Sequence, residues 1–113
     1  MHLVNMERVN EQRKVQEAIE KRILQGEFGE TGQLPTIKIV SEEYGVGTST
    51  AIASMKGLVE KGILSSKQGK GYFVAPFCRS VLVNKYTAKM RDLLKEASEL
   101  AEILGVDIKS ELD

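Results

Sequence analysis

The sequence has one cysteine, Cys78, one histidine, His2, and no tryptophan among its 113 residues. A single cysteine excludes an intramolecular disulfide, and without a cluster of histidines and cysteines we expect no structural or catalytic zinc. No stretch approaches the roughly 20 apolar residues of a membrane span, and residues 1–8 lack the apolar run of a secretory signal. These absences favour a cytoplasmic protein without a membrane anchor or a cofactor.

An excess of charge of either sign is also missing, because 16 Lys and Arg residues balance 16 Asp and Glu residues. Any nucleic-acid binding must therefore come from local charge. Between Thr36 and Pro76, five lysines and three glutamates leave a modest net charge of +2. With 42% apolar and 28% charged residues, the chain can bury a core, and its length fits one small domain with a short appendage.

Helical periodicity first becomes clear between about residues 10 and 25. The apolar face of this predicted helix holds Val15, Ala18, Ile19, Ile23 and Leu24. The opposite, charged face holds Glu11, Arg13, Lys14, Glu17, Glu20 and Lys21. We expect Gly26 to end the helix and residues 27–34 to form a turn-rich connection.

Two short helices are predicted next. Thr36 is placed to cap the first, and Gly45 to end it in the left-handed conformation. The second is expected over residues 48–61, with an inward stripe of Ala51, Ile52, Met55, Leu58 and Val59. Its opposite face is expected to hold Ser49, Thr50, Ala53, Ser54, Lys56 and Gly57. Two short helices joined by a three-residue turn indicate a helix-turn-helix.

The period changes after Gly62. Residues 63–67 and 71–75 are short and β-prone, and Gln68-Gly69-Lys70 between them reads as a tight turn. Because an isolated hairpin is marginally stable, we expect it to pack on the preceding helices. A mainly α chain with one small β-hairpin in this order is a winged helix-turn-helix, which we assign to residues 1–76.

Residues 77–113 are predicted to form a two-helix tail that mediates dimerisation. Its apolar seam has alternating spacings of three and four residues: Val83, Tyr86, Met90, Leu93, Ala97, Leu100 and Leu104. Four further residues widen the seam: Leu82, Leu94, Ala101 and Ile103. We expect Gly105 to end the long helix and Asp107 to cap a last helix over residues 108–112. Such a stripe is more often intramolecular core, but the adjoining domain is too small to cover a helix of this length.

Three stretches resemble the GntR family of bacterial transcription regulators. Gly32–Val40 is similar to its "G-x-LPS-x-R-x-L" opening, and Tyr44–Ala51 to its "LGVSRxTV" turn. Leu58–Leu64 followed by Gln68–Val74 is similar to "LExxGxI…xGxGxFV". The resemblance covers roughly residues 12–76, and the short helical tail resembles the YtrA subfamily.

The resemblance implies a homodimer that binds double-stranded operator DNA at an inverted repeat. Members of that subfamily often repress their own operon, which frequently encodes a transporter. The chain departs from the family pattern at Thr36, where Ser is usual, and at Lys38 and Thr48, where Arg is usual. Gly47 replaces the Ser that caps the recognition helix, and Ile52 stands where a charged residue is frequent. Readout of guanine by arginine is thus weakened or absent. The protein therefore either recognises a different DNA sequence or relies more on the wing and on DNA shape.

Nine residues form the predicted DNA-binding set: Thr36, Lys38, Thr48, Ser49, Thr50, Lys67, Gln68, Gly69 and Lys70. In a helix-turn-helix the start of the second helix enters the major groove, and the wing tip reaches an adjacent phosphate or minor groove. For each group a simpler interpretation stands beside this one. The hydroxyl run can cap the helix, the wing lysines can be a solvated turn, and Tyr72 and Phe73 can be strand packing.

Two other function classes compete with a DNA-binding repressor. A winged helix that binds protein instead of DNA is compatible with the zero net charge and the missing arginines. An enzyme is disfavoured, because Cys78 has no histidine nearby in sequence and no paired carboxylates stand in a cleft-forming context. A small-molecule effector, for example near Phe77 and Tyr86, is left open.

Overall fold

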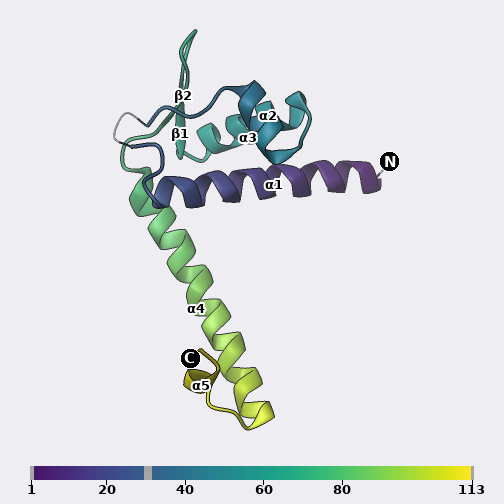
Figure 1. The fold of residues 1–113 in the computed structure, drawn as a ribbon, viewed down its shortest axis with the longest axis vertical. Coiled ribbons are helices and arrows are strands. Elements are labelled where there is room, and N and C mark those ends of the chain that lie inside the picture. Colours follow the sequence, from purple (N-terminus) through teal and green to yellow (C-terminus); the bar gives the residue numbers. More distant parts are fainter. Residues whose placement is uncertain (1, 30–31, 113) are drawn as a thin grey trace. The chain divides into compact units, whose positions relative to one another are not determined.

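The computed structural model describes residues 2–29 and 32–112, with side chains from residue 6 onward. The elements of this described part, shown in Figure 1, are α1 (His2–Leu24), α2 (Ile37–Tyr44), α3 (Thr48–Glu60), β1 (Leu64–Lys67), β2 (Gly71–Val74), α4 (Cys78–Leu104) and α5 (Ile108–Leu112). The predicted fold, mainly helical with one small hairpin, is confirmed. The chain divides into two compact units between Leu82 and Val83, so the first turns of α4 belong to the first unit.

The core of the first unit lies where α3 meets α1, α2 and β1. Figure 1 shows α1 running beneath α2 and α3 as a long rod. The buried apolar side chains come from every element of this unit except β2, and from the segments between them: Val15, Ile19, Ile23, Leu34, Val40, Ala51, Met55, Leu58, Ile63, Leu64, Cys78 and Leu82. Burial of Cys78 and Leu82 anchors the beginning of α4 in this core.

The first helix is longer than predicted and buries polar residues as well as apolar ones. It begins at His2, and Gly26 ends it as expected, with φ at 76° and its N–H donating to the Ile23 carbonyl. The placement of Glu20 on the charged outer face is wrong, because Glu20 is only 1% exposed. The face that α3 covers is therefore wider than the apolar stripe alone.

The inner face of α3 is also wider than its apolar stripe. Ser54 is fully buried and Thr50 is 8% exposed, so their assignment to the outer face is wrong. The Ser54 hydroxyl donates to the Thr50 carbonyl at 2.7 Å, which satisfies it within the helix. Gly57 lies so close to the Gln16 amide of α1 that a Cβ at this position would overlap it. Small residues thus allow α3 to approach α1 closely.

The turn between α2 and α3 follows the sequence prediction. Thr36 Oγ1 accepts a hydrogen bond from the Ile39 N–H and caps α2. Gly45 ends α2 with φ at 63°, a left-handed conformation that glycine adopts without steric cost. The Val46 N–H donates to the Ser41 carbonyl, and the Ser41 hydroxyl donates back to the Val46 carbonyl at 2.5 Å. These bonds fix the start of α3 relative to α2.

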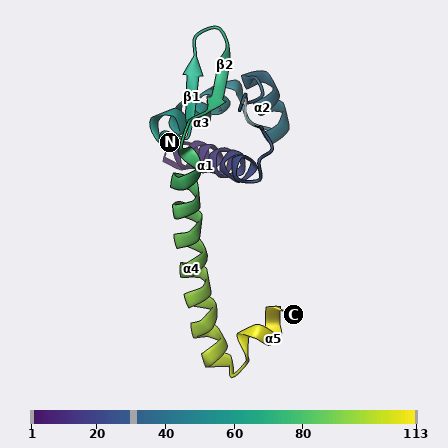
Figure 2. The same cartoon turned by 90° about the vertical axis from the view of Figure 1, so that its left-hand side faces the viewer.

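The hairpin pairs β1 with β2 in antiparallel register, from Leu64 opposite Val74 to Lys67 opposite Gly71. A short edge beside β2 was not predicted from sequence. There the Leu34 N–H donates to the Tyr72 carbonyl at 2.9 Å, and the Val74 N–H donates to the Gly32 carbonyl at 2.6 Å. Figure 2 shows the hairpin extending beyond the helices as a wing.

The second unit contains the remainder of α4 and α5. Gly105 follows α4 with φ at 70°, and Asp107 Oδ1 accepts the Lys109 N–H, so both predicted helix boundaries are confirmed. The seam residues Val83, Met90, Leu93, Leu100 and Leu104 are all exposed in the single chain, while Tyr86 and Ala97 are half-buried. Leu82 is not part of this exposed stripe, because it is buried in the first unit.

Candidate nucleic-acid interface

The outward face of α3 is short and lacks strong charge. Thr48, Ser49 and Lys56 are exposed, and Ile52 and Ala53 are half-buried. Spacings of three and four residues place Ser49, Ile52, Ala53 and Lys56 on the same side of a helix. Thr50 belongs to the inner face and presents little surface to a partner.

The N-terminus of α3 has no side-chain cap. Gly47 is the N-cap residue and supplies only backbone, in contrast to Thr36, whose hydroxyl caps α2. No hydrogen bond described for the chain involves the hydroxyl of Thr48 or Ser49. The first N–H groups of a helix carry a partial positive charge and suit a phosphate. The start of α3 therefore keeps its donors free of a side-chain cap, whereas at the start of α2 the Ile39 N–H is engaged by Thr36.

The start of α2 contributes one exposed cation. Lys38 lies in the first turn and is exposed, while the hydroxyl of the preceding Thr36 is occupied by its capping bond. Of these two predicted site residues, only Lys38 offers an unengaged polar group.

The wing tip brings four of the predicted residues together. Lys67, Gln68, Gly69 and Lys70 are all exposed, and Gly69 has φ at 74°, which the turn requires. The Lys67 ammonium lies 4.6 Å from the centroid of the Phe73 ring, close enough for a cation–π interaction. The Lys70 carbonyl accepts a hydrogen bond from the Gln33 amide at 3.1 Å. The wing is therefore an ordered basic tip whose Lys70 side chain points to solvent.

Lys56, Ile52 and Gln33 belong with this surface but were missing from the predicted set, and the placement of Ile52 in the inward stripe of α3 is wrong, because Ile52 is only half-buried and is not among the buried residues of this helix. Lys56 and Ile52 lie on α3 beside Ser49, and Gln33 supports the wing tip. Helical spacing would have found Lys56, since it is seven residues after Ser49. Nothing in the sequence pattern signalled Gln33, because its contact depends on a long-range bridge to Phe73.

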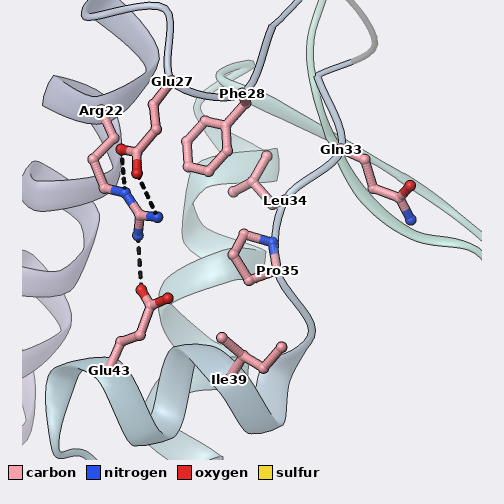
Figure 3. Close-up of a pocket in the computed structure, with 8 residues that line it drawn as sticks. All are labelled: Arg22, Glu27, Phe28, Gln33, Leu34, Pro35, Ile39 and Glu43. Atoms are coloured by element: carbon pink, nitrogen blue, oxygen red, sulfur yellow. Dashed lines mark hydrogen bonds and ion pairs between the residues drawn. The ribbon is translucent and has the colours of Figure 1, made fainter.

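A cluster around Arg22 joins α1 to the following loop and to α2 (Figure 3). The guanidinium donates to Glu27 at 2.6 and 3.1 Å, to Glu43 at 2.9 Å and to the Tyr44 hydroxyl at 2.8 Å. It also lies 5.0 Å from the centroid of the Phe28 ring. The hydrogen bond from Arg22 holds the pKa of Glu27 below its ordinary value, and the same bond raises the pKa of Arg22.

The hollow beside this cluster measures about 570 Å³ and has an apolar wall of Phe28, Leu34, Pro35 and Ile39. Because Arg22 is already engaged by two carboxylates and a phenol, its charge holds the fold together and is not directed at an anion. The described residues contain no group of three or more His, Cys, Asp or Glu side chains able to hold a metal ion.

Cys78 is buried, and burial raises the pKa of its thiol. A neutral and shielded thiol is a poor nucleophile, because the thiolate is the reactive form. Among residues 2–29 and 32–112, no helix is both long and apolar enough to cross a bilayer.

The chain is similar in sequence to known bacterial regulatory proteins. Residues 11–74 match the family model for bacterial regulatory proteins of the gntR family. The transcriptional repressor NanR of Klebsiella aerogenes is 26% identical over 87 residues, which are 77% of this chain but only 34% of NanR. The chain thus spans about a third of the length of this relative.

Two solved structures share the fold. A GntR family transcriptional regulator from Listeria monocytogenes superposes with a TM-score of 0.69 at 16% identity, over 89% of this chain and 88% of that one. The S. agalactiae protein BusR, solved in complex with its busAB promoter DNA, gives a TM-score of 0.56 at 24% identity, over 83% of this chain and 51% of BusR.

Proposed function

Because the chain belongs to the gntR family of bacterial regulatory proteins, we propose that it acts as a homodimeric repressor that binds an inverted-repeat operator. The observation that carries the proposal is the uncapped N-terminus of α3, which stands at the edge of an exposed face on a family-typical helix-turn-helix. A recognition helix enters the major groove with such a start.

The DNA contacts follow from where the donors lie. The free N–H groups and the hydroxyls of Thr48 and Ser49 bind a phosphate at the entry to the groove. Lys38 and Lys56 contact flanking phosphates, and the wing residues Lys67, Gln68, Gly69 and Lys70 reach the next stretch of backbone or the minor groove. Thr36 acts through its cap, and Thr50 acts as a buried residue of α3 and not as a DNA contact.

Dimerisation is assigned to the exposed stripe of α4. Leu93 is 55% exposed and Leu104 is 71% exposed in the single chain, although both fit a heptad seam. Rows of large apolar side chains in contact with water mark association surfaces. A second copy of the same helix covers this seam and presents two recognition helices to the two half-sites of a palindrome. Residues 77–113 are thus proposed as the dimerisation tail and residues 1–76 as the DNA-binding domain.

The proposal has three further parts. The protein represses its own operon, its tail is of the YtrA type, and it binds no cofactor. The relative NanR, a transcriptional repressor, supports repression, and the BusR complex supports binding to promoter DNA. The proposed repressor acts by occupying its operator, and an effector would act by shifting that occupancy.

The test is binding of the purified full chain to the duplex upstream of its own gene. Fluorescence anisotropy across a salt series should give an affinity that falls steeply with salt, because phosphate contacts release counterions. Light scattering at the same protein concentration should give the mass of a dimer. A monomer that shows no preference for this duplex over scrambled DNA contradicts the proposal. Binding to another protein with little salt dependence would instead favour an interaction module.

A further inference from the structure

Before Lys56, the outward face of α3 has no side chain that forms paired hydrogen bonds with a base. The helix is described in full, from Thr48 to Glu60, and holds no Arg, Asn, Gln or His. Between Thr48 and Lys56, its exposed and half-buried residues are Ser49, Ile52 and Ala53. The centre of this face is therefore made of two hydrocarbon side chains, with a hydroxyl before them and an ammonium after them.

The chemistry of base edges limits what such a face can recognise. Guanine is read by the paired donors of Arg or by Lys, and adenine by the paired groups of Asn or Gln. Thymine alone presents a methyl group in the major groove, and apolar side chains contact it. A face of Ile and Ala therefore has one matching partner among the four bases.

The spacing of the polar groups puts the apolar pair at the floor of the groove. Ser49 and Lys56 are separated by about 10 Å along the helix axis, from the rise of 1.5 Å per residue. The major groove is about 12 Å wide. Polar groups at the two ends of this face can reach the opposing backbones while Ile52 and Ala53, between them, face the base edges.

We propose that Ile52 and Ala53 read thymine methyl groups, so that each operator half-site requires thymine, and not guanine, opposite the middle of α3. This inference rests on the proposed function, which supplies the DNA. Ile52 provides the branched hydrocarbon that covers a methyl group. Ala53 has a side chain small enough to bring the helix backbone close to the neighbouring base pair. Lys56 lies at the end of this face, and we assign its ammonium to a flanking phosphate and not to a base.

The experiment alters the DNA one methyl group at a time. Selection from random duplexes with the full chain first defines the preferred site. Each thymine of a half-site is then replaced by deoxyuridine, which lacks the methyl group and keeps both pairing and groove hydrogen-bond groups. Loss of one buried methyl contact should weaken binding about four-fold. Ile52→Ala should reduce the thymine-to-uracil ratio at its contact position to near one, and Lys56→Ala should weaken binding to both duplexes equally.

The outcomes separate this inference from the function on which it rests. If the protein binds a defined site and no uracil substitution lowers the affinity, the recognition of thymine methyl groups is overturned, while the proposed repressor function stands. A required guanine opposite α3 does the same. Failure to enrich any site overturns the DNA-binding function and this inference with it. Circular dichroism of Ile52→Ala checks that the helix is retained, and the uracil series needs no protein variant.

Discussion

Gln16 of α1 and Ser54 of α3 are joined by a hydrogen bond of 3.1 Å from the Gln16 amide to the Ser54 carbonyl, at a fully buried point of the helix crossing. The same Gln16 side chain accepts a hydrogen bond from the Lys61 ammonium at 3.0 Å. One glutamine thus connects α1 to the middle and to the end of the recognition helix.

Replacing Gln16 by alanine should destabilise the protein by about 1–2 kcal/mol, because two hydrogen bonds and a buried side chain are lost. Urea unfolding followed by circular dichroism measures the change. Gln12→Ala, one turn earlier on the same helix and half-buried, is the matched control and should change stability by less than about 0.5 kcal/mol. Equal effects of the two substitutions would contradict the role of the Gln16 contacts.

Gly57→Ala should be coupled to Gln16. In the wild type the added methyl group displaces the Gln16 amide, which opposes the gain of about 1 kcal/mol in helix propensity. In a Gln16→Ala background the space is free, and the propensity gain should appear in full. A double-mutant cycle measures the difference between the two backgrounds. Additive effects would show that the close approach of these residues has no energetic consequence.

The Arg22–Glu27 contact predicts a pH dependence of stability. The pKa of Glu27 is lowered in the folded state, so this contribution is complete above the ordinary glutamate pKa of 4.5 and is lost as pH falls through the lowered value. Melting temperatures of the wild type and Glu27→Gln should therefore differ at pH 7, and the difference should shrink as the pH falls below 4.5. A difference that stays constant over this range would contradict the contact.

Lys38→Ala and Lys70→Ala should each weaken binding to all duplexes and reduce the slope of log affinity against log salt by about one unit. Both ammonium groups are exposed, one at the start of α2 and one at the wing tip. Lys109→Ala, in the short α5, provides a control with the same loss of charge and should leave the slope unchanged. An unchanged slope in either test variant removes that lysine from the phosphate contacts.

Leu93→Asp should dissociate the dimer, since a carboxylate in an apolar seam costs on the order of several kcal/mol. Ala88→Asp adds the same charge to an exposed position of α4 that the seam does not include, and should leave the dimer intact. Light scattering at micromolar concentration distinguishes the two. A dimeric Leu93→Asp variant would place the interface elsewhere.

The order of elements and their boundaries were predictable because they depend on local chemistry. Thr36, Gly45, Gly105 and Asp107 end or begin helices through bonds to neighbours in sequence, and the structure places each as predicted. The hairpin likewise follows from a tight turn between two β-prone stretches. Period and turn chemistry were sufficient for these features.

The sequence did not correctly predict the side of α1 and α3 on which small or polar residues lie. Glu20, Thr50 and Ser54 were assigned outward because polar side chains usually face water. Ser54 is buried because a neighbouring carbonyl satisfies its hydroxyl, and helix–helix contact favours small side chains. Periodicity along one helix does not show which other helix will cover each of its faces, because that depends on tertiary packing. The bridge that brings Gln33 to the wing is a tertiary contact of the same kind.

Gly32 and Leu34 share hydrogen bonds with β2, and α2 begins a few residues later at Ile37. A Cβ at position 32, where φ is 63°, would collide with Val74. Backbone hydrogen bonds therefore join the base of the hairpin to the segment that leads into the helix-turn-helix. A displacement of the hairpin would be passed through these backbone hydrogen bonds toward Thr36, so a substitution at Gly32 would disturb the wing and the lead into α2 together.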